Sequence, residues 1–380
     1  EAEAMTRLLA PYGFTPPVGR QFPVWRQTGT GLDVAAPRGG EALFDASRPA
    51  SIERAFEEAA RHRDLTIDAM AWDPLDARLL DPHGGRQDLA ARRLRAVDLS
   101  TFGTDPLRVL RVARLAASFE ASIDPRLRAL CAELSLAKLP AERISGELLR
   151  MLLDPQRPSR AFEALVAMEQ LEALPPLAAL RGVPQDPRWH PEGDVWVHTL
   201  LVLDRAAEAA RSLPIEDRRV LLLAALCHDL GKPGTTTEED GRIRAIRHEG
   251  VGARLTRDWL GALRLGERLV RKVAVLVAEH LAPSQLVAQG SKAKAYRRLA
   301  RRLHLGGATI IELERLARAD HLGRTTASAL AGVYDAGETF LATARQVGVA
   351  EGVRPDVVTA RDLMRAGVEA GPQLGRLLER

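Results

Sequence analysis

The chain has 380 residues, of which 46% are hydrophobic and 27% are charged, and its formal net charge is +4. This composition is ample for large buried cores, and the length suggests two or three domains. No apolar run is long enough to span a membrane, and no basic segment followed by an apolar stretch marks a signal peptide. The two cysteines, Cys131 and Cys227, are too few for a disulfide framework, so we expect a cytoplasmic protein without membrane contact.

The first segment is the only one with strand character. Residues 18–26 and 31–36 are rich in β-branched or aromatic side chains, and Thr28 to Gly31 between them predict a hairpin turn. After Ser51 almost the whole chain has apolar residues at spacings of three and four, with breaks at proline or glycine, which predicts helices. We therefore expect a mostly helical protein.

Two proline- and glycine-containing segments indicate boundaries. Residues 184–191 are predicted to be a linker, and residues 348–355 a loop ahead of a short terminal module. Arginine and lysine gather in residues 86–114 and again in residues 292–302. Such clusters are typical of a surface that binds the phosphate backbone of a nucleic acid, and they also occur on the solvated faces of surface helices.

Seven of the nine histidines lie between His190 and His321. Four of them, with two carboxylates, are strung along segments that are predicted to be helical: His198, His228, Asp229, His248, His280 and Asp320. Imidazole nitrogens and carboxylate oxygens together select a divalent metal that accepts both kinds of ligand. The sequence therefore predicts a metal site.

The doublet His228-Asp229 ends an apolar helix that Gly231 and Pro233 terminate. A charged Asp at the end of a buried helix needs a partner, and a metal is the obvious one. Asp194 lies four residues before His198, where it either orients the imidazole or caps the helix.

This pattern resembles the HD phosphohydrolase superfamily, named after the His-Asp doublet. The resemblance implies that His198, His228, Asp229 and Asp320 hold one metal, and that His248 and His280 signal a second. It also implies a catalytic site at His228, Asp229 and Lys232 that hydrolyses a phosphoester with metal-activated water. Lys232 is a candidate to hold a phosphate. The three arginines Arg242, Arg244 and Arg247 could do the same, but a solvated basic loop is the favoured interpretation of these three. Nickel, manganese, cobalt or iron suit this mixed ligand set better than magnesium.

The part before residue 185 resembles a second family. Three segments are similar to consecutive motifs of bacterial tRNA nucleotidyltransferases (CCA-adding enzymes) and poly(A) polymerases: residues 63–71, 80–89 and 104–114. Residues 189–194 are similar to the start of the HD domain that many bacterial CCA-adding enzymes carry. The resemblance covers nearly the whole chain in the family's order, and it implies that ATP, CTP and a tRNA or other RNA 3′ end are partners.

The resemblance also implies roles for individual residues. Asp105 and Arg108 match the pair that reads the base of the incoming nucleotide, and being three residues apart they can project from one side of a helix start. Arg111 and Arg114 continue that face, for triphosphate or helix-bracing contacts. Asp64 is implied to couple the head to the neck.

Departures from the family lie mainly in the head. Nucleotidyl transfer needs paired carboxylates that hold Mg²⁺ against ATP or CTP, yet the sequence contains no Asp-x-Asp. Asp33 matches the family's third acidic residue, and Thr104 replaces a usual acidic one. We expect either a fragment of a longer enzyme, in which the intact head would use magnesium, or a short homologue that has lost polymerising activity.

The predicted architecture is a truncated α/β nucleotidyltransferase head, a helical neck and body, an all-α HD domain and a short helical tail. The boundaries are 1–75 for the head, 76–120 for the base-reading neck, 121–185 for the body, 186–340 for the HD domain and 341–380 for the tail. The predicted function is tRNA 3′-end processing, with metal-dependent phosphodiesterase or phosphatase activity in the HD domain. The alternatives are a stand-alone HD phosphohydrolase with a degenerate head and a non-catalytic RNA-binding scaffold.

Overall fold

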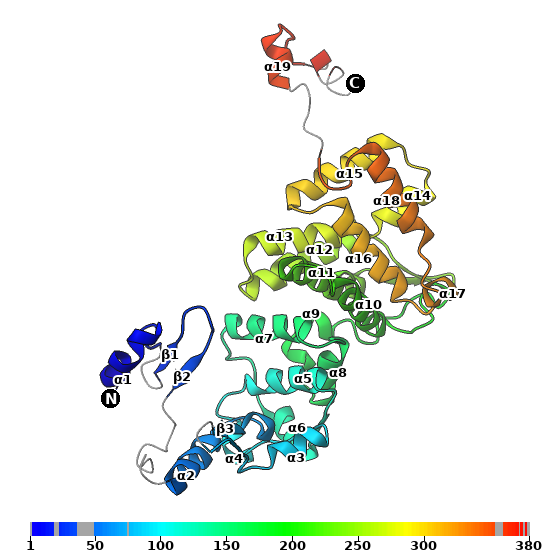
Figure 1. The fold of residues 1–380 in the computed structure, drawn as a ribbon. Coiled ribbons are helices and arrows are strands. Elements are labelled where there is room, and N and C mark those ends of the chain that lie inside the picture. The colour runs from blue at the N-terminus through cyan, green and yellow to red at the C-terminus, as the bar shows by residue number, and fades with distance from the viewer. Residues whose placement is uncertain are drawn as a thin grey trace. The chain divides into compact units, whose positions relative to one another are not determined.

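The computed structural model describes residues 2–18, 23–35, 49–73, 76–353, 360–371, 373–374 and 377. The chain forms two compact units, Glu1–Leu174 and Pro175–Arg380 (Figure 1). The prediction of a mostly helical fold is confirmed. The five-part division expected from the sequence is finer than these two units and stays a prediction.

The first unit contains all but two of the short strands. Its elements are α1 (Ala2–Leu9), β1 (Val24–Arg26), β2 (Asp33–Ala35), α2 (Pro49–Ala60), β3 (Ala71–Asp73), β4 (Arg78–Leu80), α3 (Gly85–Ala90), β5 (Arg93–Leu94), α4 (Leu99–Phe102), α5 (Arg108–Ser118), β6 (Ser122–Ile123), α6 (Pro125–Glu133), α7 (Ala141–Leu153) and α8 (Ser159–Ala167). Helix α5 is central because it packs on α7 and α8. Its apolar side chains, among them Val109, Val112 and Ala113, are fully buried, and its arginines lie on the opposite face.

The predicted N-terminal hairpin exists over the described part of that segment. Strands β1 and β2 pair antiparallel, with Trp25 opposite Val34. The turn is closed by the amide of Gln27, which donates to the carbonyl of Leu32. Residues 19–22 and Ala36, which the predicted strands included, lie outside the described residues.

The expectation that almost everything after Ser51 is helical was wrong in detail. Strands β3 and β4 pair antiparallel, β5 and β6 pair parallel, and the second unit contains the hairpin of β7 (Thr236–Glu239) and β8 (Arg242–Ala245). Asp240 and Gly241 both adopt positive φ at the tip of this last hairpin. An Asp-Gly pair favours a two-residue turn of this kind, and that signal overrides the helical spacing around it.

Over its described residues, the second unit has no strands besides that hairpin. Its helices are α9 (Pro175–Ala178), α10 (Val195–Ala210), α11 (Ile215–Cys227), α12 (His248–Ala262), α13 (Glu267–Glu279), α14 (Ala282–Ala288), α15 (Ala293–Gly306), α16 (Ile310–Leu322), α17 (Ala327–Leu330), α18 (Asp335–Val347) and α19 (Ala360–Arg365). Helix α11 lies at the centre, in contact with α10, α12, α13 and α16 (Figure 1). Its residues 220–227 are all buried, which is why this stretch is apolar on every side.

Two local signals set the ends of the neighbouring helices. Asp194 caps α10 by accepting from the amide of Val197 at 2.9 Å. At the start of α16, Thr309 and Glu312 form a reciprocal capping box. These caps determine where each helix begins, and thereby which of its side chains face α11.

Gly231 allows the closest approach in the second unit. A Cβ atom at this position would lie 2.0 Å from the carbonyl oxygen of His248 and 2.6 Å from the amide nitrogen of Gly252. Only glycine lets the turn after α11 meet the first turn of α12 in this way.

Within the described ranges, every helix is too short or too polar to span a membrane. The sequence between Arg361 and Leu378 also predicts two short helices joined by a turn, and α19 is the first of them. The second falls largely on residues outside the described ranges, as does the end of the loop predicted for residues 348–355.

Candidate metal centre

Five segments of the second unit each bring one or two side chains to a common point. His198 lies in the first turn of α10, and His228 and Asp229 end α11. His248 opens α12, His280 ends α13, and Asp320 lies in the last turns of α16. All six residues are buried, with at most 7% of any of them exposed. The structure thus brings together residues that lie up to 122 positions apart.

The first half of the cluster surrounds one oxygen of Asp229. Oδ2 of Asp229 lies 3.2 Å from Nε2 of His228 and 3.9 Å from Nε2 of His198. Nε2 of His198 also lies 3.1 Å from Oδ1 of Asp320. Nitrogen and oxygen donors from three helices therefore face one another.

The second half shares the same carboxylate. Oδ1 of Asp229 lies 3.3 Å from Nε2 of His248, which is 3.3 Å from Nε2 of His280. Two three-residue groups have ligand atoms within 4.8 Å of one another, namely His198, His228, Asp229 and Asp229, His248, His280. Asp229 belongs to both, which is the arrangement that a bridging carboxylate needs.

Three of the four imidazoles are oriented by the backbone. Nδ1 of His228 donates to the carbonyl of Ala225, Nδ1 of His248 to that of Ala245, and Nδ1 of His280 to that of Val277, at 2.7 to 2.8 Å. A carbonyl oxygen only accepts, so each Nδ1 carries a proton and each ring points Nε2 to the centre.

The charges within the cluster are strongly coupled. Burial would raise the pKa of Asp229, but His228 and Lys232 hold that pKa well below its usual range. Burial lowers the pKa of His280 to about 3, with His228 and His248 adding to the effect, so this ring is neutral at physiological pH. A neutral imidazole and ionised carboxylates are the forms that bind a cation.

The donor set fits a divalent metal. Nε2 of His228 is buried, and within the described part of the chain it has no hydrogen-bond partner, whereas the buried Oδ2 of Asp229 forms an ion pair with Lys232 at 2.7 Å. A buried polar atom without a partner is costly, so the presence of Nε2 of His228 at a point where nitrogen and carboxylate oxygen atoms converge indicates a cation site. Mixed nitrogen and oxygen ligands suit a transition metal.

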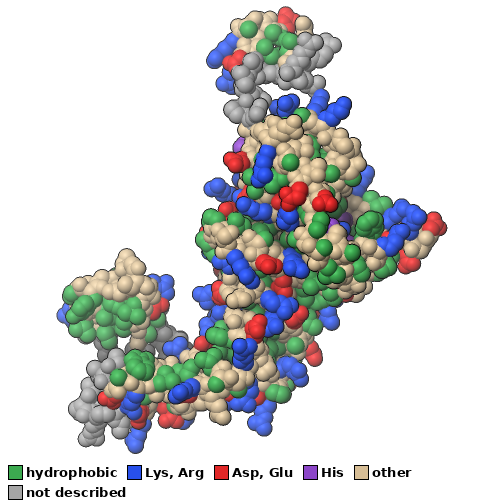
Figure 2. All heavy atoms as spheres, turned by 45° about the vertical axis from the view of Figure 1, so that its right-hand side comes forward, with side chains coloured by type: hydrophobic (Ala, Val, Ile, Leu, Met, Phe, Trp, Pro, Cys, Tyr) green, Lys and Arg blue, Asp and Glu red, His purple; other side chains and the backbone are tan. Residues whose placement is uncertain are grey.

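A cavity of about 260 Å³ opens directly onto the cluster, lined by Asp229, His248, His280 and Asp320. Figure 2 shows histidine side chains inside a recess of the surface of this unit. The cavity wall carries both signs of charge, with the basic side chains Lys232, Arg244 and Arg324 and the carboxylates Asp186, Asp229 and Asp320. Nζ of Lys232 lies 2.7 Å from Oδ2 of Asp229 and donates to Oε1 of Gln185 at 2.6 Å.

The segment that was predicted to be a linker contributes to this cavity. Gln185, Trp189 and His190 line it, and the amide of Val195 donates to the carbonyl of Val183, which ties the segment to the start of α10. Of the two roles predicted for Asp194, the structure has the helix cap.

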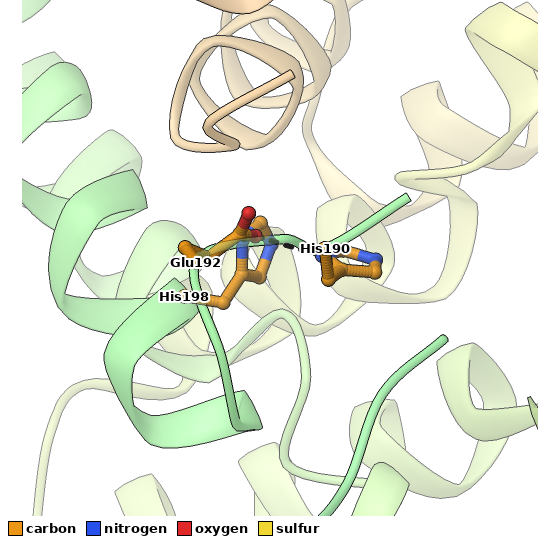
Figure 3. Close-up of side chains that lie close together, drawn as sticks. All are labelled: His190, Glu192 and His198. Atoms are coloured by element: carbon orange, nitrogen blue, oxygen red, sulfur yellow. Dashed lines mark hydrogen bonds and ion pairs between the residues drawn. The ribbon is translucent and has the colours of Figure 1, made fainter. Parts of the chain in front are cut away.

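Sequence reasoning missed Glu192 and His190. Oε1 of Glu192 accepts from Nδ1 of His198 at 2.8 Å and from Nδ1 of His190 at 2.9 Å (Figure 3). Burial would raise the pKa of Glu192, but these two contacts hold it well below its usual range. Burial lowers the pKa of His190 to about 4. The signal was present, since both residues lie in the segment 189–194 that carried the family resemblance.

In the first unit, two arginines of α5, Arg111 and Arg114, have carboxylate partners. Nε of Arg111 lies 2.6 Å from Oδ2 of Asp64, and Nε of Arg114 lies 3.0 Å from Oε2 of Glu147. Asp64 and Glu147 are both buried. These pairs connect α5 to other segments of its own unit.

The two residues predicted to read a base are held by different partners. Oδ2 of Asp105 accepts from Nη2 of Arg143 at 2.7 Å. Burial would raise the pKa of Asp105, and Arg143 lowers it. The guanidinium of Arg108 donates to the carbonyls of Thr101 and His62 at 3.1 and 2.7 Å. Both side chains lie near the start of α5, as expected.

Asp33, the candidate third head carboxylate, lies on the exposed strand β2. Both of its oxygens accept from Arg26 on β1 at 2.8 Å. The hydrogen bond with Arg26 is the main cause of the lowered pKa of Asp33.

Comparison with known proteins extends these observations over most of the chain. Residues 21–95 match the poly A polymerase head domain, and residues 195–325 match the HD domain. A multifunctional CCA protein of Cupriavidus taiwanensis is 36% identical over 315 residues, which cover 78% of this chain and 69% of that protein. The chain belongs to the multifunctional CCA protein family.

Further relatives agree with this membership. A multifunctional CCA protein of Cupriavidus metallidurans is 38% identical over 284 residues, covering 70% of this chain and 65% of the relative. The chain thus spans about 65% of the length of such relatives. All six residues of the metal cluster lie inside the HD match, whereas His190 and Glu192 precede it.

Solved structures share the fold. A CCA-adding enzyme in complex with CTP has a TM-score of 0.58 at 17% identity, covering 100% of this chain and 78% of that one. A Thermotoga maritima CCA-adding enzyme in complex with tRNA has a TM-score of 0.56 at 17% identity, covering 100% and 77%. The helical architecture with a small strand-containing first part is therefore that of this family.

Proposed function

We propose that this multifunctional CCA family member is a tRNA 3′-end processing enzyme whose HD domain hydrolyses phosphoesters with a divalent metal. The hydrolase is the activity that the geometry supports best. The single observation that carries it is the buried meeting point of His198, His228, Asp229 and Asp320, with His248 and His280 beside it and a cavity that contains Lys232, Arg244 and Arg324 in front.

The proposed ligands are the residues whose nitrogen or oxygen atoms face the centre of the cluster. One cation would be held by His198, His228, Asp229 and Asp320. A second cation would be held by His248 and His280, and Asp229 would be shared between the two. When bound, a divalent cation supplies a water of lowered pKa and offsets negative charge on the phosphoryl oxygens. We propose nickel, manganese, cobalt or iron, because imidazole and carboxylate donors are mixed at this site.

The cavity residues bind and orient the substrate. Lys232 is held at the cavity wall by Asp229 and Gln185, so its ammonium group can contact a phosphate oxygen without a large rearrangement. Arg244 and Arg324 line the same cavity and add two further cationic groups. Such groups favour an anionic phosphoester over a neutral ester.

Nucleotidyl transfer to tRNA is the second part of the proposal. It rests on the family membership, on relatives that are named multifunctional CCA proteins, and on similarly folded CCA-adding enzymes in complexes with CTP and with tRNA. Asp105 and Arg108 are the proposed base-reading pair, and Asp64, Arg111 and Arg114 brace the nucleotide-binding neck. Mg²⁺ with ATP or CTP would act in the head, although the sequence of this chain contains no Asp-x-Asp. Cys131 and Cys227 are buried and form no disulfide, which fits tRNA processing in the cytoplasm.

The test of the hydrolase uses the full chain. Protein stripped with chelator and reloaded with Mn²⁺ or Ni²⁺ is assayed on 2′,3′-cyclic nucleotides, beside the double variant His228→Ala, Asp229→Ala. We expect activity only in the reloaded wild type. A matched control is His304→Ala, which removes an exposed histidine of α15 outside the cluster. Equal activity in wild type and double variant would exclude the site.

The transferase is tested separately. Labelled CTP and ATP are offered with Mg²⁺ and a tRNA transcript that lacks its 3′ CCA. Incorporation would support the complete proposal. Hydrolysis without incorporation would leave the stand-alone HD phosphohydrolase, and RNA binding with neither activity would leave the non-catalytic scaffold.

A further inference from the structure

His198 differs from the other three cluster histidines in what holds its ring. The other three each donate from Nδ1 to a carbonyl three residues earlier in the chain. For His198 that carbonyl belongs to Val195 at the start of α10, where it accepts from Oγ1 of Thr199 at 2.8 Å. The ring of His198 therefore needs a partner from outside its own helix.

Glu192 is that partner. Its side chain is only 1% exposed, and Oε1 accepts from Nδ1 of His198 at 2.8 Å. The same oxygen accepts from Nδ1 of His190 at 2.9 Å, and Oε2 accepts from the amide of Thr325 at 3.0 Å. The carboxylate thus accepts hydrogen bonds on both oxygens, and Figure 3 shows it close to the imidazole rings of His198 and His190.

A third cation at His190, Glu192 and His198 is disfavoured by the same geometry, although these three side chains also lie within 4.8 Å of one another. Both Nδ1 atoms are at hydrogen-bonding distance from a single oxygen. Nε2 of His198 is directed to Asp320 in the main cluster. One imidazole cannot give both nitrogens to separate cations while keeping a proton on Nδ1.

We propose that Glu192 is a positioning residue, which keeps the proton of His198 on Nδ1 and so presents the lone pair of Nε2 to the metal cluster. This inference rests on the proposed metal-dependent function of the cluster. Glu192 couples His198 to His190, a cavity-lining residue, and through Thr325 to the segment after α16. It does for His198 what a backbone carbonyl does for His228, His248 and His280.

Glu192→Gln is a sharp test because the amide group has no suitable place. If the NH₂ group of the new side chain faces the two imidazoles, both rings must accept a hydrogen bond at Nδ1 and carry their proton on Nε2. In His198, Nε2 is the nitrogen that is proposed to bind the metal. If the NH₂ group faces Thr325 instead, it meets the backbone N–H of Thr325, and two hydrogen-bond donors face each other in a buried position. Either arrangement disturbs the centre while changing very little volume.

The chain offers a matched control in Glu249→Gln. Oε2 of Glu249 lies 3.8 Å from Nδ1 of His248, but that ring is already oriented by the carbonyl of Ala245. This variant removes a charge beside a proposed ligand without removing the group that orients it.

Two measurements on the full chain at pH 7.5 decide the proposal. With ¹⁵N-labelled histidine, long-range proton–nitrogen spectra of the metal-free protein report which ring nitrogen of His198 carries the proton, assigned by the loss of signals in His198→Gln. The dissociation constant for Mn²⁺ is measured by competition with a chelating dye. We expect Nδ1 of His198 to carry a proton in wild type, with or without a second proton on Nε2 facing Asp320, and Mn²⁺ binding weakened about 10- to 100-fold in Glu192→Gln, with Glu249→Gln within about twofold of wild type.

The outcomes are separable. A His198 ring that carries its proton on Nε2 alone in the wild-type protein would overturn the proposal even if the Glu192→Gln variant failed to fold. Equal Mn²⁺ affinity in wild type and folded Glu192→Gln would also overturn it. Absence of Mn²⁺ binding in wild type would refute the proposed function instead, while the ring tautomer would still report on Glu192.

Discussion

Nε2 of His248 lies 3.3 Å from Nε2 of His280, and both rings are oriented by backbone carbonyl groups that accept a hydrogen bond from Nδ1. In their neutral forms the two facing nitrogens both carry lone pairs and cannot hydrogen-bond to each other. A cation between or beside them removes that conflict. This pair is therefore the clearest sign that the half of the cluster beyond the His-Asp doublet also takes a metal.

The first prediction concerns the number of metal ions. His280→Ala should remove the second ion and leave the one held with His198, so the metal content should fall from about two to about one per chain. His228→Ala combined with Asp229→Ala should abolish both, because Asp229 is shared. Metal analysis after reloading and desalting gives the ratio. His304→Ala should retain the wild-type content, and an unchanged content in His280→Ala would remove the second site.

The second prediction concerns Gly231. A methyl group there meets the carbonyl of His248 and the amide of Gly252, so Gly231→Ala must push the start of α12 away from the His-Asp turn. We expect a loss of about 1–3 kcal/mol in unfolding free energy and weaker metal binding through His248. Urea unfolding and Mn²⁺ titration measure the two effects. Gly234→Ala is the control, because a Cβ at Gly234 would meet nothing within 4 Å; equal results for both variants would refute the steric argument.

The third prediction separates base reading from bracing in the first unit. Arg111→Met leaves the buried Asp64 carboxylate without its closest partner, so it should lower the unfolding free energy by about 2 kcal/mol. Asp105→Asn should instead weaken CTP binding with little change in stability, since Asp105 and Arg143 are both substantially exposed. Thermal unfolding and CTP titration distinguish the two. A strongly destabilised Asp105→Asn variant would mean that this residue is structural.

The fourth prediction is a pH dependence at Asp88. This carboxylate is fully buried and accepts from Thr66, Arg93 and Arg95. Burial would raise its pKa, but these partners hold the pKa below the usual value. Because the folded pKa is the lower one, the stabilisation is complete above the unfolded pKa of about 3.9 and is lost as the pH falls through the folded pKa.

Asp88→Asn should therefore be less stable than wild type by about 2 kcal/mol at pH 7. The difference should shrink in acid, as wild-type Asp88 becomes protonated. Urea unfolding at pH 7 and at the lowest pH where the wild type stays folded gives both differences. A gap that stays constant with pH would show that the ionised form contributes nothing.

Much of the metal centre was accessible from the sequence because its chemistry depends on residue type. The six predicted ligands could be named from imidazoles and carboxylates at helix ends, and the apolar run 220–227 indicated a buried helix that ends at His228. The hairpin of β7 and β8 was missed, because helical spacing was given more weight than the Asp240-Gly241 turn.

The sequence by itself determined the helical character and the family and indicated the candidate ligands, since periodicity, composition and motif order are local properties of the chain. Only the tertiary structure decided that Asp194 caps α10 while Glu192, two residues earlier, orients His198. It also decided that the segment 184–191 lines the cavity, and that Asp64 pairs with Arg111. These relationships depend on where a helix begins and on which distant segment packs beside it, and those are set by the packing of the whole unit.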